Sequence, residues 1–169
     1  MIGGFPEVVS IQHHGDQRVS GIDPEAMQSA EAVELDQSMK IAVVLRTDLE
    51  PWQRLNVAAF TISGVASQDG AVGEAYRDAS GNRYLPMFKN PVLVFGAETD
   101  EMARTVGRAR SRDVPFSIFT RDLFDTFNDI DNRAAVAAVA AEGLDVVGLA
   151  FRADRRIADK VLKGLKLLR

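Results

Sequence analysis

The stretch Lys40-Ile-Ala-Val-Val-Leu-Arg-Thr-Asp-Leu49 is the strongest indication of how this chain folds. Its continuous apolar run is typical of a strand that is covered on both faces. The run ends in a charged corner at Arg46 and Asp48, and Pro51 then suits the first turn of a helix that we expect to reach about Val65. Open α/β sheets bind ligands at the carboxyl ends of their strands, so this corner is a candidate site.

Strands and helices alternate along the rest of the chain. We expect further buried strands at residues 91–97, 115–119 and 144–151. Helices are expected after Thr99, over the Ala-rich stretch 133–141 and over residues 153–168. The runs 73–78 and 83–88 flank a turn-rich segment and predict an inserted β-hairpin. This order predicts an α/β fold in which helices flank a mixed, mostly parallel sheet.

Apolar spacing on two of these helices predicts which side faces the core. Helical periodicity places five residues of the first helix on one buried face: Trp52, Leu55, Ala59, Ile62 and Ala66. The same spacing gives the last helix an inward face made of Ile157, Val161, Leu165 and Leu168. Both helices are therefore expected to pack against the sheet through these rows.

Length and charge divide the chain into two parts. At 169 residues and 46% hydrophobic content it suits one globular domain with a sizeable core. Residues 1–38 hold seven acids and one base, a net charge of −6, and show no sustained periodicity. The remaining 17 acids and 19 bases give residues 39–169 a net charge of +2. We therefore expect an acidic, weakly structured extension, residues 1–38, ahead of a domain at 39–169.

Residue usage excludes several classes of chemistry. The chain has no cysteine, which rules out disulfides, thiolate metal sites and a cysteine nucleophile. Its two histidines, His13 and His14, both lie in the extension, so the domain has no histidine for a catalytic triad. We expect no metal and no cofactor. No apolar run approaches the roughly 20 residues that span a bilayer, and a cytoplasmic protein without a membrane partner is expected.

Two carboxylates are candidates for acid–base chemistry. Asp48 and Asp122 each follow a predicted strand, and we expect those two strands to lie side by side. Carboxylates that share a cleft can share a proton or act as acid and base. The alternative is structural: Asp48 would cap the following helix and pair with Arg46 or Arg121.

The first turns of the helix after the corner carry a candidate ligand platform. Trp52 and Asn56 share a helical face, while Gln53 is turned by about 100° from Trp52. Indole stacking together with amide hydrogen bonds suits a small organic ligand. The alternative is a core tryptophan beside surface amides. Lys89, which follows the predicted hairpin, projects into the same cleft or is simply solvated.

Basic residues recur at helical spacing in two places. Arg104, Arg108 and Arg112 form one stripe, and a second occupies residues 152–163. Such stripes can follow an RNA backbone. Acids interrupt both stripes and no aromatic side chains interleave with them, so a tRNA partner is considered but not favoured.

Three blocks in the same order resemble the peptidyl-tRNA hydrolase II superfamily. The first is the strand with its Arg46-x-Asp48-Leu49 corner and Ala-rich helix, and the second is Pro115-Phe-Ser-Ile-Phe-Thr-Arg-Asp-x-x-x-Thr126. The third is Gly148-Leu-Ala-Phe with the ending Ile157-Ala-Asp-Lys-Val-Leu-Lys-Gly-Leu-Lys-Leu-Leu168. The chain is most similar to a bacterial branch catalogued as a domain of unknown function, numbered two thousand. Shared features are Trp52-Gln53-x-Leu55-Asn56-Val57 and the hairpin segment Tyr84-Leu-Pro-Met-Phe-Lys89.

The resemblance implies a three-layer peptidyl-tRNA hydrolase II-like fold, an active site at the corner and a homodimer. Asn56 stands where these enzymes have a lysine near the scissile ester, and Phe60 stands where they have a glutamine. An amide can orient a carbonyl but supplies no positive charge. The aspartate and threonine of the second block are retained as Asp122 and Thr126.

Three functional hypotheses follow. In the first, the protein binds or processes a small ligand in a pocket made of Asp48, Trp52, Gln53, Asn56, Lys89, Arg121, Asp122 and Thr126, with Arg46 beside it. In the second, it hydrolyses peptidyl-tRNA or a related aminoacyl ester, with Asp122 positioning water and Lys89 replacing the lost lysine. In the third, it is a non-catalytic dimeric interaction protein. If it is an enzyme, it is expected to be a hydrolase.

Overall fold

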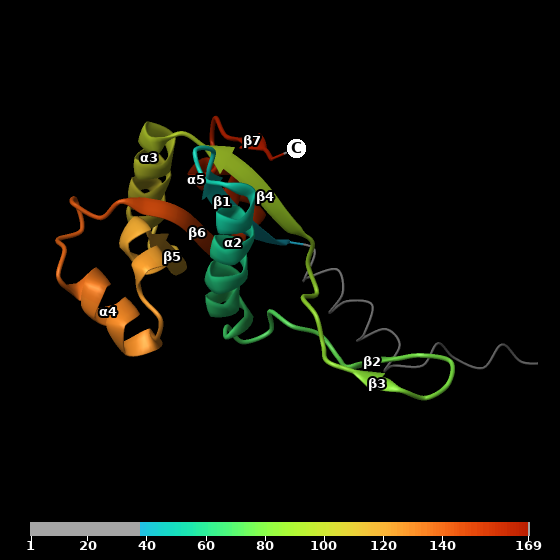
Figure 1. Cartoon of the computed structure of the whole chain (residues 1–169). Helices are drawn as coiled ribbons and strands as arrows, with labels where there is room; N and C mark the ends of the chain where they lie inside the picture. The colour runs from blue at the N-terminus through green and yellow to red at the C-terminus, as the bar shows by residue number, and fades with distance from the viewer. Residues whose placement is uncertain (1–37, 169) are drawn as a thin grey trace, which may run out of the picture.

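One five-stranded sheet organises the domain. The computed structural model describes residues 38–168, so residues 1–37 of the expected acidic extension lie outside the described part. The strands are β1 (Met39–Arg46), β4 (Val92–Ala97), β5 (Phe116–Thr120), β6 (Val146–Asp154) and β7 (Lys166–Leu167). Their order across the sheet is β5-β6-β1-β4-β7, with β1 in the centre (Figure 1).

The sheet is mixed, as expected, but most of its pairings are antiparallel. Only β1 and β4 pair in parallel, whereas β1–β6, β5–β6 and β4–β7 are antiparallel. The prediction of a mostly parallel sheet was wrong. A parallel return needs a connection that crosses over a face of the sheet. Between β5 and β6 the chain instead forms η1 (Arg121–Asp125) and α4 (Asp129–Ala137), which pack beside each other. As a result, β6 starts at the edge where β5 ends.

Helices cover both faces of the sheet and make three layers. α2 (Pro51–Ala66) packs on β1, β5 and β6 from one side, and α3 (Thr99–Arg110) and α5 (Arg155–Val161) cover the other side (Figure 1). The apolar run of β1 serves both layers by alternation. Ile41, Val43 and Leu45 belong to the core under α2. Ala42 and Val44 belong to the core under α3 and α5.

The rotation of α2 on the sheet differs from the prediction. The helix starts at Pro51 as expected, but its buried residues are Val57, Thr61 and Val65. Trp52 is 61% exposed and Leu55 is 73% exposed, so the predicted inward row faces solvent at its N-terminal end. Periodicity cannot choose between the rows because both are spaced for a helix.

A close contact with β6 explains which row of α2 is buried. A Cβ atom on Gly148 would lie 2.1 Å from Cγ1 of Val57. The missing side chain at Gly148 therefore makes a hollow that Val57 enters. This rotation of the helix fills the hollow with Val57, as the close packing of a protein interior requires.

The C-terminal helix is shorter than predicted. α5 ends at Val161, and Gly164 takes a left-handed conformation with φ of +92°. β7 then pairs with β4 at the sheet edge, and the amide of Leu168 donates to the carbonyl of Val94. The predicted helix over residues 153–168 was therefore confirmed over residues 155–161 and wrong after Val161. Glycine favours a chain reversal here, and the unpaired edge of β4 supplies partners for the last residues.

The predicted β-hairpin is present. β2 (Tyr76–Arg77) pairs with β3 (Arg83–Tyr84), and the hairpin projects away from the three layers (Figure 1). Asp78 holds its turn by accepting hydrogen bonds from the amides of Ser80 and Asn82 and from the Tyr84 hydroxyl. The local sequence thus specifies the hairpin.

None of the helices between residues 38 and 168 combines the length and apolarity that a bilayer crossing requires.

Candidate functional site

Four charged side chains form a closed ring at one edge of the sheet. Arg46 donates from Nε and Nη2 to both carboxylate oxygens of Asp48, at 3.0 and 2.7 Å, and from Nη1 to Asp145 Oδ1 at 3.0 Å. Arg121 closes the ring by donating to Asp145 Oδ2 and to Asp48 Oδ2, both at 2.9 Å. We call Arg46, Asp48, Arg121 and Asp145 the charge ring. Its net charge is zero.

Sheet topology brings the four residues together. Arg46 ends β1, Arg121 opens η1 directly after β5, and Asp145 directly precedes β6. Because β6 runs antiparallel to both neighbours, its start lies at the edge where they end. β6 also separates β1 from β5, so the expectation that the strands before Asp48 and Asp122 lie side by side was wrong.

The members of the ring differ in how far they are buried, and burial and charge shift the pKa values of Asp48 and Arg121. Arg46 is only 6% exposed, whereas the carboxylates of Asp48 and Asp145 are about half exposed. Partial burial acts to raise the pKa of Asp48, but hydrogen bonds and charge from Arg46 and then Arg121 outweigh it and leave that pKa below its ordinary value of 3.8. The hydrogen bond to Asp145 is the main cause that raises the pKa of Arg121. Asp48 and Arg121 are therefore both charged at neutral pH.

A cavity of about 210 Å³ adjoins the ring. It lies between α3 and the segment that leads into β6, and Arg46 and Asp145 line one part of it. The rest of the lining mixes apolar and polar side chains: Thr99, Met102, Ala103, Val106, Gly107, Arg110, Ala141, Glu142, Leu144 and Val146. Arg46 thus presents a nearly buried cation to a partly apolar space.

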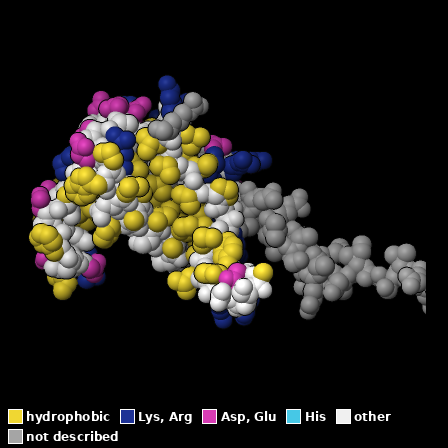
Figure 2. All heavy atoms as spheres, turned by 45° about the vertical axis from the view of Figure 1, so that its right-hand side comes forward, with side chains coloured by type: hydrophobic (Ala, Val, Ile, Leu, Met, Phe, Trp, Pro, Cys, Tyr) yellow, Lys and Arg dark blue, Asp and Glu magenta, His cyan; other side chains and the backbone are white. Residues whose placement is uncertain are grey.

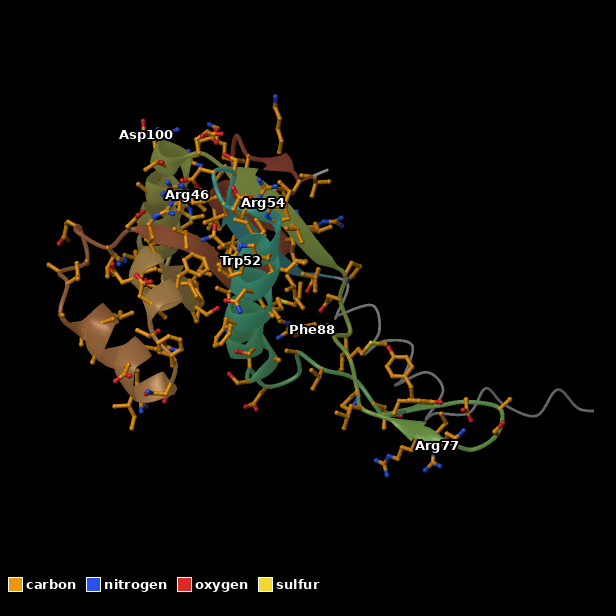
Figure 3. The ribbon with its side chains drawn as sticks, viewed as in Figure 1. Arg46, Trp52, Arg54, Arg77, Phe88 and Asp100 are labelled. Atoms are coloured by element: carbon orange, nitrogen blue, oxygen red, sulfur yellow. The ribbon has the colours of Figure 1, made fainter. Side chains whose placement is uncertain are left out.

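A second arginine fixes the corner that carries Asp48. Arg54 of α2 donates to the carbonyls of Leu49 and Thr47, at 2.9 and 2.8 Å. Figure 3 shows Arg54 and Arg46 at the same edge of the domain, above Trp52. The corner is therefore held from the helix side as well as from the ring. Sequence reasoning did not identify Arg54, because nothing in its spacing distinguishes it from a solvated arginine.

Aromatic rings connect the other side of α2 with η1 and β5. Trp52 meets Phe124 edge to face at a centroid distance of 5.7 Å, and Phe124 lies 5.0 Å from Phe119. Phe119 in turn lies 5.8 Å from Phe60. Trp52 is thus neither a core residue nor isolated: it forms one of the two exposed ends of an aromatic row.

The remaining predicted platform residues have separate roles in the structure. The Gln53 side chain accepts from the amide of Glu50 in the capping box of α2, so Glu50 rather than Asp48 caps this helix. Asn56 is half-buried. The hydroxyl of Thr126 donates to the carbonyl of Leu123, at 2.9 Å, and also contacts Asn132. These contacts stabilise the local fold and leave Gln53 and Thr126 with little capacity for a ligand.

Asp122 and Lys89 are both exposed, at different places. Asp122 lies in the first turn of η1, next to Arg121, and its side chain forms no hydrogen bond or ion pair within residues 38–168. Lys89 precedes β4, whose first residue, Val92, pairs with Ile41 at the start of β1. Five residues of strand, roughly 17 Å, separate that end of the sheet from Arg46. Lys89 therefore does not join the charge ring.

Asp145 was missed at the sequence level. It is an acid directly before a buried strand, and in a mostly parallel sheet such a residue would lie at the edge opposite Asp48. The antiparallel direction of β6 reverses its position. Within residues 38–168, no three His, Cys, Asp or Glu side chains are grouped as a metal site.

Known proteins place the chain in a family. The model of the family described as protein of unknown function DUF2000 matches residues 39–169. The chain belongs to the DUF2000 family. The domain also resembles a solved structure of a protein of unknown function from Agrobacterium tumefaciens strain C58. The two are 41% identical with a TM-score of 0.75, over 78% of this chain and 98% of that one. No curated protein matches this DUF2000 chain.

Proposed function

We propose that this DUF2000 protein binds a small organic molecule in the cavity beside the charge ring. The observation that carries the proposal is the nearly buried guanidinium of Arg46 in the cavity wall. A guanidinium has five N–H groups. Three of them donate to Asp48 and Asp145, which leaves two for a ligand. Small-molecule sites typically combine an apolar wall with a few fixed polar groups of this kind.

The size and charge of the site indicate the class of ligand. An apolar cavity of about 150 Å³ accommodates benzene, so the 210 Å³ here suits a somewhat larger compact molecule. Because two carboxylates already neutralise the two arginines of the ring, a ligand gains little from a negative charge. A neutral hydrogen-bond acceptor, such as an amide carbonyl attached to an apolar ring, fits Arg46 best.

Benzamide, benzoate and benzyl alcohol are suitable probes, with binding followed by amide chemical shifts in NMR. We expect benzamide to bind with millimolar affinity, to bind more tightly than benzoate, and to shift resonances of α3 and residues 141–146. Gly107→Leu should abolish these shifts, because position 107 lines the cavity and no atom lies within 4 Å of an added Cβ. Ala137→Leu, at an exposed position of α4, is the control and should leave them unchanged.

Failure of all three probes to shift resonances in this region would overturn the proposal. Shifts that persist in Gly107→Leu would place the binding elsewhere. The ester-hydrolysis alternative is not proposed, because it relied on Lys89 to replace the missing lysine and Lys89 lies at the far end of the sheet.

We further propose that this family is a bacterial branch of the peptidyl-tRNA hydrolase II superfamily. Support comes from the order of β1, the Arg46-x-Asp48 corner and α2, and from the Asp122 and Thr126 pair at a spacing of four. An experimental structure of this chain whose strand order and helix positions fail to superpose on such an enzyme would refute the relationship.

A further inference from the structure

α2 carries large apolar side chains outside its buried face, and the domain covers them only in part. Its buried face, Val57, Thr61 and Val65, already packs on the sheet. Outside that face Trp52, Leu55 and Phe60 are 61%, 73% and 53% exposed, although Trp52 and Phe60 each touch one ring of the aromatic row. We call Trp52, Leu55 and Phe60 the α2 face. A surface helix normally has one apolar stripe, and contiguous exposed apolar side chains mark interaction sites.

The hairpin presents further apolar side chains without a surface to pack on. Tyr76, Tyr84, Leu85 and Met87 are between 49% and 86% exposed, and we call them the arm. β2 and β3 pair with each other and have no extensive contacts with the other described elements. Figure 2 shows hydrophobic side chains continuing from the domain onto the hairpin. An isolated two-stranded hairpin is marginally stable in water, so the arm is suited to pack on another surface.

We propose that the arm of one copy of this chain packs on the α2 face of a second copy, and the reverse. A two-fold dimer brings the two apolar surfaces together twice, because every copy carries both. Aromatic side chains bury about 150–250 Å² each. Four of the seven side chains are aromatic, and at roughly half exposure they offer about 400 Å² per copy. The more exposed Leu55, Leu85 and Met87 bring this toward the roughly 800 Å² per partner of a stable interface.

Charges at the edges of the two surfaces are complementary. The arm carries exposed Arg77 and Arg83, and Figure 3 shows Arg77 far from the body of the domain. Beside the α2 face, η1 carries exposed Asp122 and Asp125. None of the four forms an ion pair within residues 38–168. Opposite charges at the rim steer association and fix its orientation, which favours a second copy as the occupant.

Sedimentation equilibrium of the full chain at micromolar concentration tests the proposal. We expect a dimer, and we expect Leu55→Glu and Leu85→Glu each to weaken it by about a hundredfold, because each buries a charge in an apolar contact. Both side chains are exposed in the monomer, so both variants should fold, which circular dichroism can check. Ile157→Glu, on α5 over the opposite face of the sheet, is the control and should remain dimeric.

Engineered cysteines can locate the contact, since the chain has none of its own. Mixed Leu55→Cys and Leu85→Cys proteins should form a disulfide between the two different variants on mild oxidation. A monomeric native chain, or a dimer that survives both glutamate variants, would overturn the proposal. Preferential linkage of Leu85→Cys to itself would also overturn it, because the arms would then pair with each other.

Discussion

Replacing Arg46 by methionine removes the charge at the centre of the ring and keeps most of the apolar stem. Arg46 is 6% exposed and makes three hydrogen bonds to carboxylates. A hydrogen bond to a charged group contributes a net of about 1.5–3 kcal/mol, and breaking a buried ion pair costs about 3–5 kcal/mol. Asp48 and Asp145 are about half exposed and keep their ion pairs with Arg121, so solvation and Arg121 offset part of the free-energy cost of losing Arg46. We expect unfolding free energy to fall by about 2–4 kcal/mol at pH 7.

Urea unfolding followed by circular dichroism measures this loss, with Arg104→Met as the control. Arg104 is exposed on α3, and its replacement should change the unfolding free energy by less than about 0.5 kcal/mol. The difference between Arg46→Met and the native protein should shrink as the pH falls below 3.8 and Asp48 becomes protonated. If Arg46→Met lies within about 0.5 kcal/mol of the native protein at pH 7, the ring does not stabilise the fold and the reasoning fails.

Three further substitutions test individual contacts. The lowered pKa of Asp48 adds stability that is present above 3.8 and is lost as pH falls through the folded-state value, so Asp48→Asn should flatten the acid limb of a stability-against-pH curve. Gly148→Ala should cost about 3 kcal/mol or more in urea unfolding, because its Cβ would overlap Val57, whereas Gly107→Ala should stabilise α3 by up to about 1 kcal/mol. Arg54→Met should cost about 1–2 kcal/mol in thermal unfolding, through the loss of two hydrogen bonds to the corner carbonyls.

Local sequence patterns predicted where the strands and helices lie better than they predicted the direction in which the strands run. The apolar run of β1, Pro51 at the start of α2 and the turn-rich segment of the hairpin all correspond to the structure. These features depend on residues close together in the chain. The extent of α5 was wrong because a left-handed glycine and the free edge of β4 outweighed the helical spacing of its apolar residues.

The candidate site was predictable only in part, because its assembly depends on strand direction and helix rotation, which local sequence does not specify. Arg46 ends a strand, Asp48 and Arg121 follow strands, and their pairing was an alternative that the sequence itself suggested. Asp145 joins them only because β6 runs antiparallel. The arrangement of Trp52, Phe124, Phe119 and Phe60 likewise depends on how α2 is rotated on the sheet.

The sequence alone therefore determined the α/β class, the charged corner after β1 and the hairpin, because hydrophobic periodicity and turn chemistry act over a few neighbouring residues. Tertiary structure decided strand direction, the membership of the charge ring, and which face of α2 is buried. Those outcomes depend on contacts between residues far apart in the chain, such as Val57 with Gly148 and Arg46 with Asp145. Two helix faces of similar apolarity differ little in transfer free energy, and the shape of the surface they meet selects between them.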